Sequence, residues 1–449
     1  NKVANGLINR GLQKGDKVSL LSTNRLEVLE VLFGTVKAGG VIVPLSAMVP
    51  GDSLARMVID SDSRFLFVGP GLQDTMGPYR SEFSNIAADG FFALGDPVEG
   101  WNSYQSLVDE SSEEKPGISL IYEDPINIMY TSGTTGVPKG ILHTHHNRTQ
   151  FASMFAIDYR IDSSAVNIVT TALYANGTWL TMLPTVFAGG TLVVMPAFDP
   201  RAFLELVQKE KCTHTFMVPT QFTVLLEQPD FDSYDLSSMR IWNSAGSPLR
   251  AQTKAEVIKR FSGELVELWG LTEGVATTLK PEDMENKMES VGLPLVGWDV
   301  RIIDEEGREL PRGEAGEIVA FSSFLMPEYY KLPDKTAEEI WLDETGKTYL
   351  KTGDMGKLDE DGFLYILDRK KDMIISGGIN IFASDIEDVL TRHPAVQDAI
   401  VIGIPHPKWG ETPIAMVIAR EGESISEEEL IEWVNPRLAK SQRITRVEL

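Results

Sequence analysis

The chain has 449 residues, of which 43% are hydrophobic and 24% charged, ordinary values for a globular enzyme of roughly two to four domains. Asp and Glu number 65 against 41 Lys and Arg, so the formal net charge is −24. Such a surface repels phosphate backbones and anionic lipid, and we expect no nucleic-acid or membrane-surface function. The single cysteine, Cys212, excludes an internal disulfide and a cysteine zinc site, which favours a reducing, cytoplasmic setting.

Short apolar strands alternate with helical patterns over the first two-thirds of the chain. This alternation indicates parallel sheets covered on both faces, and we expect two stacked α/β subdomains. The acidic segment Phe91–Lys115 is predicted to be a surface connection between them. A helix is predicted at Leu26–Lys37, and strands at Lys17–Ser22, Val41–Leu45, Arg64–Val68, Ile126–Tyr130, Ala165–Ala172, Thr191–Met195, His214–Val218, Arg240–Ser244 and Leu265–Trp269.

One uncharged stretch, Ser163–Phe198, is long enough to suggest a membrane span. Asn176, Gly177 and Pro184 are among the residues that divide it into pieces too short to cross a bilayer. We therefore expect a buried strand–helix–strand segment here, and no transmembrane helix.

From Val300 the pattern changes to short strands around tight turns, which is typical of antiparallel structure. Beyond Asp368 it changes again, to a compact α+β pattern. We therefore predict an α/β protein with a large N-terminal domain over residues 1–367, made of two parallel-sheet subdomains and a small antiparallel subdomain. A small mobile domain over residues 368–449 follows a hinge at Asp368. Because both ends stop within a pattern, we expect a piece of a longer chain whose C-terminal domain is truncated.

The most informative segment is the loop Tyr130–Gly140, which reads Tyr-Thr-Ser-Gly-Thr-Thr-Gly-Val-Pro-Lys-Gly. It follows an apolar strand and is expected to precede a helix. Backbone N–H groups, hydroxyls and one lysine in such a loop can wrap a phosphate. The spacing Gly-x-x-x-x-Gly-Lys-Ser/Thr of the common nucleotide loop is absent from the chain. A solvated turn explains a shorter run of small residues, but this order favours a phosphate site.

This loop resembles the signature of the adenylate-forming superfamily, which comprises acyl-CoA synthetases, adenylation domains of peptide synthetases, and luciferases. Four further motifs follow in the family's order and extend the resemblance over almost the whole chain. They are His145-His146-Asn147, similar to Thr-His-x-Asn; Trp269-Gly270-Leu271-Thr272-Glu273, similar to Tyr-Gly-x-Thr-Glu; Thr352-Gly353-Asp354, similar to Thr-Gly-Asp; and Gly362–Asp372, similar to the hinge motif.

The resemblance implies that a carboxylate is joined to the α-phosphate of ATP with release of pyrophosphate, so placed positive charge and Mg²⁺ carry the reaction. Lys139 would hold the β- and γ-phosphates, Thr272 would contact the α-phosphate, and Glu273 would bind Mg²⁺; these are the candidate catalytic residues. The other implied cofactor-binding residues are Thr131, Ser132, Gly133, Thr134, Thr135, Gly136, His145, Gly246, Ser247, Trp269, Gly270, Asp354, Arg369, Gly377 and Gly378.

Among these residues, Asp354 and Arg369 are implied to contact the ribose, and Trp269 to stack on the adenine. Taken singly, several candidates also fit structural roles: Thr272 and Glu273 suit a helix N-terminus, Asp354 a turn, and Trp269 the core. Only the full set of motifs favours the functional interpretation.

The sequence departs from the family's pattern in two places. Leu173–Gly177 stands where relatives that activate fatty or aromatic acids often carry Phe-His-x-x-Gly, so Tyr174, which is uncharged at neutral pH, replaces a histidine. The family's catalytic lysine is expected beyond Leu449. The residues implied to line the substrate pocket are Tyr174, Asn176, Gly177, Asn243, Ser244 and Trp269.

Three functions compete: a CoA ligase, an adenylation domain that serves a carrier protein, and a luciferase-like or non-enzymatic binding protein. Ser376–Glu387 resembles the post-hinge loop of acyl-CoA synthetases, and its glycines allow pantetheine to approach the backbone closely. Leu173–Trp179 offers no acidic residue to bind the ammonium group of an amino acid. We therefore favour an AMP-forming acyl-CoA synthetase that uses ATP, Mg²⁺ and CoA.

The expected substrate is a hydrophobic monocarboxylic acid, aromatic or of medium to long chain. The predicted pocket segments are apolar and aromatic, and they carry no Arg or Lys for a second carboxylate. Relatives are often dimers, so the resemblance allows a homodimer, although no residue indicates one.

Overall fold

The computed structural model describes residues 1–131, 139–376, 379–420, 422–423 and 425–449. The described residues form two compact units: unit 1 comprises Asn1–Asp299 and Phe321–Ile340, and unit 2 comprises Val300–Ala320 and Trp341–Leu449. The antiparallel strands that begin near residue 300 therefore group with the C-terminal part of the chain. The predicted boundary after residue 367 concerns a hinge movement and stays a prediction.

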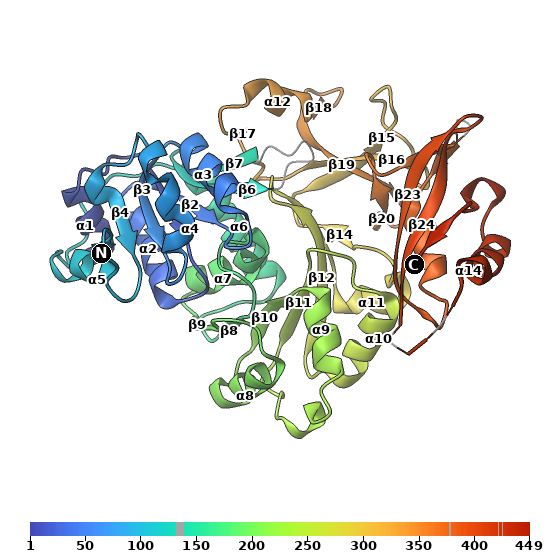
Figure 1. Cartoon of the computed structure of the whole chain (residues 1–449), viewed down its shortest axis with the longest axis horizontal. Coiled ribbons are helices and arrows are strands. Elements are labelled where there is room, and N and C mark those ends of the chain that lie inside the picture. Colours follow the sequence, from blue (N-terminus) through green and yellow to red (C-terminus); the bar gives the residue numbers. More distant parts are fainter. Residues whose placement is uncertain (132–138, 377–378, 421, 424) are drawn as a thin grey trace. The chain divides into compact units, whose positions relative to one another are not determined.

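The first sheet of unit 1 consists of β1 (Lys17–Leu21), β2 (Val41–Leu45), β3 (Ser63–Val68), β4 (Phe91–Ala93), β5 (Asn102–Ser103), β6 (Pro125–Thr131), β7 (Lys139–Thr144) and β17 (Glu328–Tyr329). Its strand order is β17-β7-β6-β2-β1-β3-β4-β5. Figure 1 labels β17, β7, β6, β2, β3 and β4 of this sheet. The strands from β6 to β5 pair in parallel, whereas β7 pairs antiparallel with β6 and β17 with β7. The helices of this part are α1 (Lys2–Asn9), α2 (Leu26–Lys37), α3 (Gly51–Asp60), α4 (Gln73–Met76) and α5 (Tyr104–Asp109).

The second sheet of unit 1 consists of β8 (Val166–Val169), β9 (Thr191–Val194), β10 (His214–Met217), β11 (Ile241–Ser244), β12 (Glu264–Leu271), β13 (Val275–Leu279) and β14 (Leu293–Pro294). Its order is β14-β13-β12-β11-β10-β8-β9, with antiparallel pairing only at β13 and β14 among the described strands. The remaining helices of unit 1 are α6 (His145–Asp158), α7 (Asn176–Ala188), α8 (Pro200–Glu210), α9 (Pro219–Leu226), α10 (Ala251–Arg260), α11 (Pro281–Lys287) and α12 (Pro333–Glu338).

Unit 2 contains two largely antiparallel sheets. The first has β15 (Asp299–Ile303), β16 (Gly316–Phe321), β19 (Thr348–Leu358) and β18 (Ile340–Leu342) in that order, and β20 (Leu364–Arg369) pairs with β19. The second has β22 (Ile379–Ile381), β21 (Ile374–Ser376), β24 (Gly410–Ala419) and β23 (Val396–His406), with β25 (Val447–Glu448) beside β24. Helices α13 (Ala383–Leu390) and α14 (Glu427–Val434) pack their apolar residues onto the second sheet.

The predicted α/β class is confirmed, with parallel sheets in the N-terminal region and antiparallel sheets in the C-terminal region. The described residues contain no helix long and apolar enough to cross a membrane.

Three local predictions were wrong. The loop Tyr130–Gly140 was expected to precede a helix, but strand β7 (Lys139–Thr144) comes first and α6 begins only at His145. The residues of β7 pair with β6, and Ile141 and His143 are buried. The first sheet also continues beyond the predicted surface connection Phe91–Lys115, since the later strands β6 and β7 belong to it. Phe91–Lys115 itself contains strands and a helix, with Phe91 and Phe92 buried.

His214 of β10 is expected to make the fold sensitive to acid. Its Nδ1 lies 2.7 Å from the Thr213 hydroxyl, and its Nε2 lies 3.1 Å from the Tyr159 carbonyl oxygen, which accepts a hydrogen bond from it. Burial lowers the pKa of His214 to about 4. Between the unfolded pKa of about 6.5 and the folded pKa of about 4, His214 is therefore protonated in the unfolded chain and neutral in the folded chain.

The stability contributed by neutral His214 is complete above pH 6.5 and is lost as the pH falls toward 4. Between pH 7 and pH 5 the loss should be about 2 kcal/mol. Urea unfolding at both pH values measures it, and His214→Gln should flatten the difference. An equal pH dependence in the variant would assign the effect to other groups.

Candidate active site

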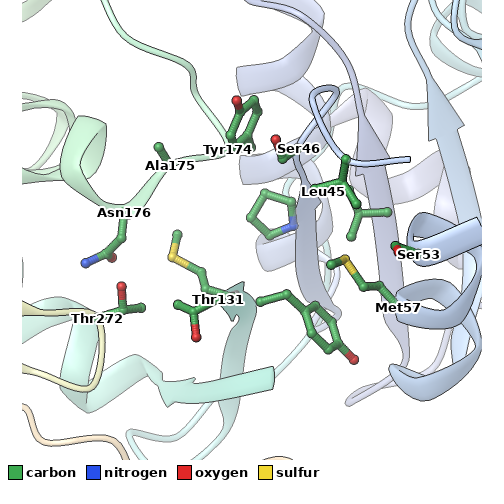
Figure 2. Close-up of a pocket in the computed structure, with 13 residues that line it drawn as sticks. Leu45, Ser46, Ser53, Met57, Thr131, Tyr174, Ala175, Asn176 and Thr272 are labelled. Atoms are coloured by element: carbon green, nitrogen blue, oxygen red, sulfur yellow. The ribbon is translucent and has the colours of Figure 1, made fainter. Parts of the chain in front are cut away.

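A pocket of about 400 Å³ lies in unit 1, and residues of both sheets and their loops line it (Figure 2). Four of the predicted site residues line this pocket: Thr131, Tyr174, Asn176 and Thr272. Tyr130 and Ala175, which lie in the predicted loop and in a predicted pocket segment, line it as well. The sequence analysis missed the other lining residues, which are Pro44, Leu45, Ser46, Val49, Ser53, Met57 and Met129. In Figure 2 the polar side chains of Asn176, Thr131 and Thr272 lie toward one end of the pocket, and Ser53 and Met57 toward the other.

A buried histidine that the sequence analysis missed supports the pocket at Thr272. His143 Nε2 lies 2.9 Å from the Thr272 carbonyl oxygen, and His143 Nδ1 lies 3.0 Å from Asn127 Nδ2. An amide nitrogen only donates, so Nδ1 accepts and Nε2 carries the proton that it donates to Thr272. Burial, together with the charge of Arg148, holds the pKa of His143 well below its usual range. The imidazole is therefore neutral and fixes the backbone of the Thr272 loop.

The predicted histidine, His145, lies at the first residue of α6 and does not line the pocket described above. Its Nε2 is buried and has no hydrogen-bond partner among the described residues. No sequence pattern marked His143, because Lys139–Thr144 shows no alternation of apolar and polar residues and only the structure shows that His143 is buried on β7.

The structure brings the predicted catalytic residues Lys139 and Glu273 to the same tyrosine. The Tyr329 hydroxyl donates to Glu273 Oε1 at 2.9 Å, and Lys139 Nζ lies 4.9 Å from the centroid of the Tyr329 ring. Lys139 also forms an ion pair with Glu339 at 3.8 Å. Burial raises the pKa of Glu273, while the Tyr329 hydroxyl and the Lys139 charge oppose the rise. No motif indicated Tyr329.

Glu273 and its neighbours fit a Mg²⁺ ion only together with a bound phosphate. The described residues contain no group of three or more His, Cys, Asp or Glu side chains that could hold a metal ion. Mg²⁺ is commonly held by one or two carboxylates, with substrate phosphates and water completing its six ligands. Glu273, a carboxylate beside the predicted α-phosphate contact Thr272, matches that pattern.

Buried charged residues hold the predicted adenine loop, which contains Gly246 and Ser247. Gly246, the second residue after β11, adopts φ +94°, a conformation that favours glycine, and Gly246 and Ser247 are exposed. The Leu249 N–H donates to Glu267 at 3.0 Å, and Glu267 forms a buried ion pair with Lys254 at 2.5 Å. Trp269 and Gly270 follow on the same strand as Glu267, β12.

In unit 2 the two predicted ribose contacts lie together. Asp354 of β19 pairs with Arg369 of β20, and Arg369 Nε lies 3.5 Å from Asp354 Oδ1. The predicted hinge residue Asp368 accepts the Arg369 N–H at 2.7 Å and the Ser384 N–H at 3.4 Å. The Ser384 hydroxyl also donates to the Leu367 carbonyl oxygen. Leu367 and Asp368 are therefore both hydrogen-bonded to Ser384, at the start of α13.

The other predicted pocket residues of unit 1 do not line the pocket described above, and Gly177 and Trp269 are half-buried. A Cβ atom on Gly177 would lie 2.7 Å from Phe216 Cζ, so Gly177 allows α7 to pack on β10. Asn243 and Ser244 are buried on β11. Both amide atoms of Asn243 and the Ser244 hydroxyl have no hydrogen-bond partner among the described residues. Ser132, Gly133, Thr134, Thr135, Gly136, Gly377 and Gly378 lie outside the described residues.

The chain matches two family models. Residues 1–330 match the AMP-binding enzyme model, and residues 385–449 match the AMP-binding enzyme C-terminal domain. The chain belongs to the AMP-binding enzyme family. The resemblance predicted from the motifs and the prediction of an enzyme are therefore confirmed.

Curated relatives and solved structures agree with this assignment. A feruloyl-CoA synthase of Amycolatopsis is 33% identical over 98% of this AMP-binding enzyme and 85% of its own length. The long-chain-fatty-acid–CoA ligase FadD13 of Mycobacterium tuberculosis is 32% identical, with the same two coverages. The crystal structure of ATP-bound MatB from Rhodopseudomonas palustris superposes with a TM-score of 0.89 at 31% identity, covering 100% of this chain and 87% of that one.

Asn243 of this AMP-binding enzyme is expected to contribute to activity at the expense of stability. Its side chain faces the Tyr159 hydroxyl, yet neither group has a hydrogen-bond partner within normal distance among the described residues. An unsatisfied buried polar group costs roughly 1–3 kcal/mol, so Asn243→Leu should raise the unfolding free energy by about 1 kcal/mol. If the amide meets the substrate, kcat/KM should fall about tenfold in the same variant.

Chemical denaturation and steady-state kinetics on the same Asn243→Leu preparation separate the two effects. A gain in stability with unchanged kcat/KM would assign Asn243 to the core alone.

Proposed function

We propose that this enzyme is an AMP-forming acyl-CoA synthetase. It activates a hydrophobic monocarboxylic acid with ATP to an acyl adenylate and pyrophosphate, and then transfers the acyl group to CoA. The observation that carries this proposal is the pocket of unit 1, where polar Thr131, Asn176 and Thr272 share an otherwise largely apolar wall. Glu273 directly follows Thr272 in the chain, and both Glu273 and Lys139 contact Tyr329.

In the first half-reaction a carboxylate oxygen of the acid forms a bond to the α-phosphorus, and the bond from that phosphorus to pyrophosphate breaks. Lys139 would offset the charge of the β- and γ-phosphates, and the Thr272 hydroxyl would donate to an α-phosphate oxygen. Mg²⁺ at Glu273 would supply further positive charge for the departing pyrophosphate. Neutral His143 holds the Thr272 backbone in place by its hydrogen bond of 2.9 Å.

The pocket supports an apolar monocarboxylate as the substrate. Leu45, Met57 and Met129 are among its apolar lining residues, and within the described part of the chain no Lys or Arg lines it. A volume of about 400 Å³ is at the lower end of small-molecule sites. Relatives are a feruloyl-CoA synthase, a long-chain-fatty-acid–CoA ligase and an indoleacetate–CoA ligase, which agrees with an aromatic or medium- to long-chain acid.

In the second half-reaction the CoA thiol attacks the acyl carbonyl and AMP leaves, after the C-terminal domain has rotated about Asp368. Asp354 and Arg369 are proposed to hold the ribose hydroxyls. Transfer to a carrier protein is the second candidate, because a fatty acid–[acyl-carrier-protein] ligase of Streptomyces coeruleorubidus is 32% identical.

ATP–pyrophosphate exchange, measured over a panel of acids with and without CoA, tests the proposal. Exchange with a hydrophobic acid, followed by CoA-dependent release of AMP, is the expected result. Exchange that never couples to CoA, or that occurs only with amino acids, would favour the carrier-protein alternative.

A further inference from the structure

A buried arginine without an acidic partner lies behind the polar end of the pocket. Arg148 of α6 is 4% exposed. Its guanidinium packs 4.7 Å from the ring centroid of Trp179 and 5.1 Å from that of Phe151. Its only polar neighbours among the described residues are neutral, and no carboxylate contributes to its electrostatic environment. Burial lowers its pKa to about 9, so it stays charged at neutral pH.

Burying a charge without a counter-charge is costly, so this arrangement requires a reason. The motif analysis does not explain it, because Arg148 directly follows the His145-His146-Asn147 motif and belongs to none of the motifs. Its hydrogen bonds show what the charge acts on: Nη1 donates to Asn176 Oδ1 at 2.9 Å, Nε to Asn127 Oδ1 at 2.8 Å, and Nη2 lies 3.3 Å from His143 Nδ1.

Arg148 thereby determines what the pocket wall presents. A guanidinium has only donors, so the atom of Asn176 that faces it must be the amide oxygen. The opposite atom of that amide, Nδ2, is then left as a donor, and Asn176 lines the pocket. Through His143, the same guanidinium supports the Thr272 backbone, and Thr272 lines the pocket as well. One cation is thus connected to two residues of the polar end.

We propose that Arg148 is a positioning residue for the carboxylate of the acid: it orients the Asn176 amide as a donor and places a buried positive charge behind it. This inference rests on the proposed function for the location of the carboxylate, beside Thr131 and Thr272. It also accounts for the uncharged Tyr174 in the pocket wall, because the positive charge comes from α6 instead.

The test compares carboxylates with their neutral amides in direct binding to the full chain. Calorimetry with benzoate against benzamide, and octanoate against octanamide, needs neither ATP nor CoA. A charge-assisted interaction predicts that the wild-type protein binds the carboxylate roughly 10- to 100-fold more tightly than the amide. Arg148→Met, which keeps the packing on Trp179, should reduce this ratio to about one and leave amide affinity unchanged.

Asn176→Asp separates positioning from a purely structural role. The new carboxylate pairs with Arg148, so the thermal midpoint should stay the same or rise, yet the pocket now presents an acceptor and the carboxylate preference should disappear. Arg201→Met is the matched control. Arg201 of α8 is exposed and pairs with Asp230 at 3.2 Å, so its loss removes one positive charge from the surface. The ratio should be unchanged in this control.

Three results would overturn the inference. They are a wild-type protein that binds neither form or shows no preference, an Arg148→Met variant that weakens both forms equally, and an Asn176→Asp variant that keeps the preference. A wild-type protein that prefers carboxylates but never forms a thioester would contradict the CoA ligase proposal and leave the role of Arg148 intact.

Discussion

Replacing Glu273 by Gln is expected to lower Mg²⁺-dependent adenylation about 100-fold or more, with little change in stability. The amide has the size of the carboxylate and can still accept the Tyr329 hydroxyl, which now donates to Glu273 at 2.9 Å. It carries no charge for Mg²⁺, and loss of a metal or transition-state charge contact costs roughly 10²- to 10³-fold in rate. Since burial raises the pKa of Glu273, removing its charge should not destabilise the fold.

Pyrophosphate release as a function of Mg²⁺ concentration, and thermal unfolding of the same preparation, measure the two quantities. Glu338→Gln is the control, because Glu338 is an exposed carboxylate paired with Lys335 at 2.7 Å. This control should leave the Mg²⁺ dependence unchanged. If Glu273→Gln loses activity and stability in equal proportion, Glu273 is a structural residue.

Asp368→Pro is expected to reduce thioester formation about 10- to 100-fold while adenylation continues. Proline fixes φ near −65°, so a rotation about this residue is blocked, and a misplaced reacting group costs about 100-fold in rate. The substitution tests the hinge because Asp368 stands on β20, paired with Met355 of β19, immediately before the predicted ribose contact Arg369.

Single-turnover experiments separate the two half-reactions, with pyrophosphate release reporting adenylation and acyl-CoA reporting transfer. Asp368→Ala is the control, since it removes the hydrogen bond from the Ser384 N–H, which is 3.4 Å long, but keeps backbone rotation. Equal losses in the Ala and Pro variants would assign the effect to the side chain. Loss of both half-reactions in the Pro variant would contradict a hinge at this position.

Much of the fold follows from local patterns. The strand predicted at Val41–Leu45 and the helix at Leu26–Lys37 match β2 and α2 residue by residue. A fully apolar run buried on both faces, or an apolar stripe with helical spacing, carries its own structural signal. Lys139–Thr144 was missed because its strand character depends on pairing with β6, which the residues 139–144 do not encode alone.

The pocket residues likewise comprise some that motifs predicted and others that only the structure shows. The motifs predicted Thr131, Asn176 and Thr272 as site residues, and each of them lines the pocket. Motifs can mark such candidates because phosphate and carboxylate recognition demands particular residue types at short spacing. Leu45 and Met57 line the opposite end, and no motif marks them, since any apolar residue of suitable size fills such a wall. Their role depends on where β2 and α3 lie relative to the loops of the second sheet.

By itself, the sequence determined the family and the α/β class, because these depend on short motifs and on apolar periodicity within single elements. Only the tertiary structure decided which groups support the motif residues. His143, Arg148 and Tyr329 look ordinary in the chain, yet they contact Thr272, Asn176 and Glu273 across separations of 129, 28 and 56 residues. Hydrogen bonding and burial over such distances depend on how strands and helices pack, and no local pattern encodes that packing.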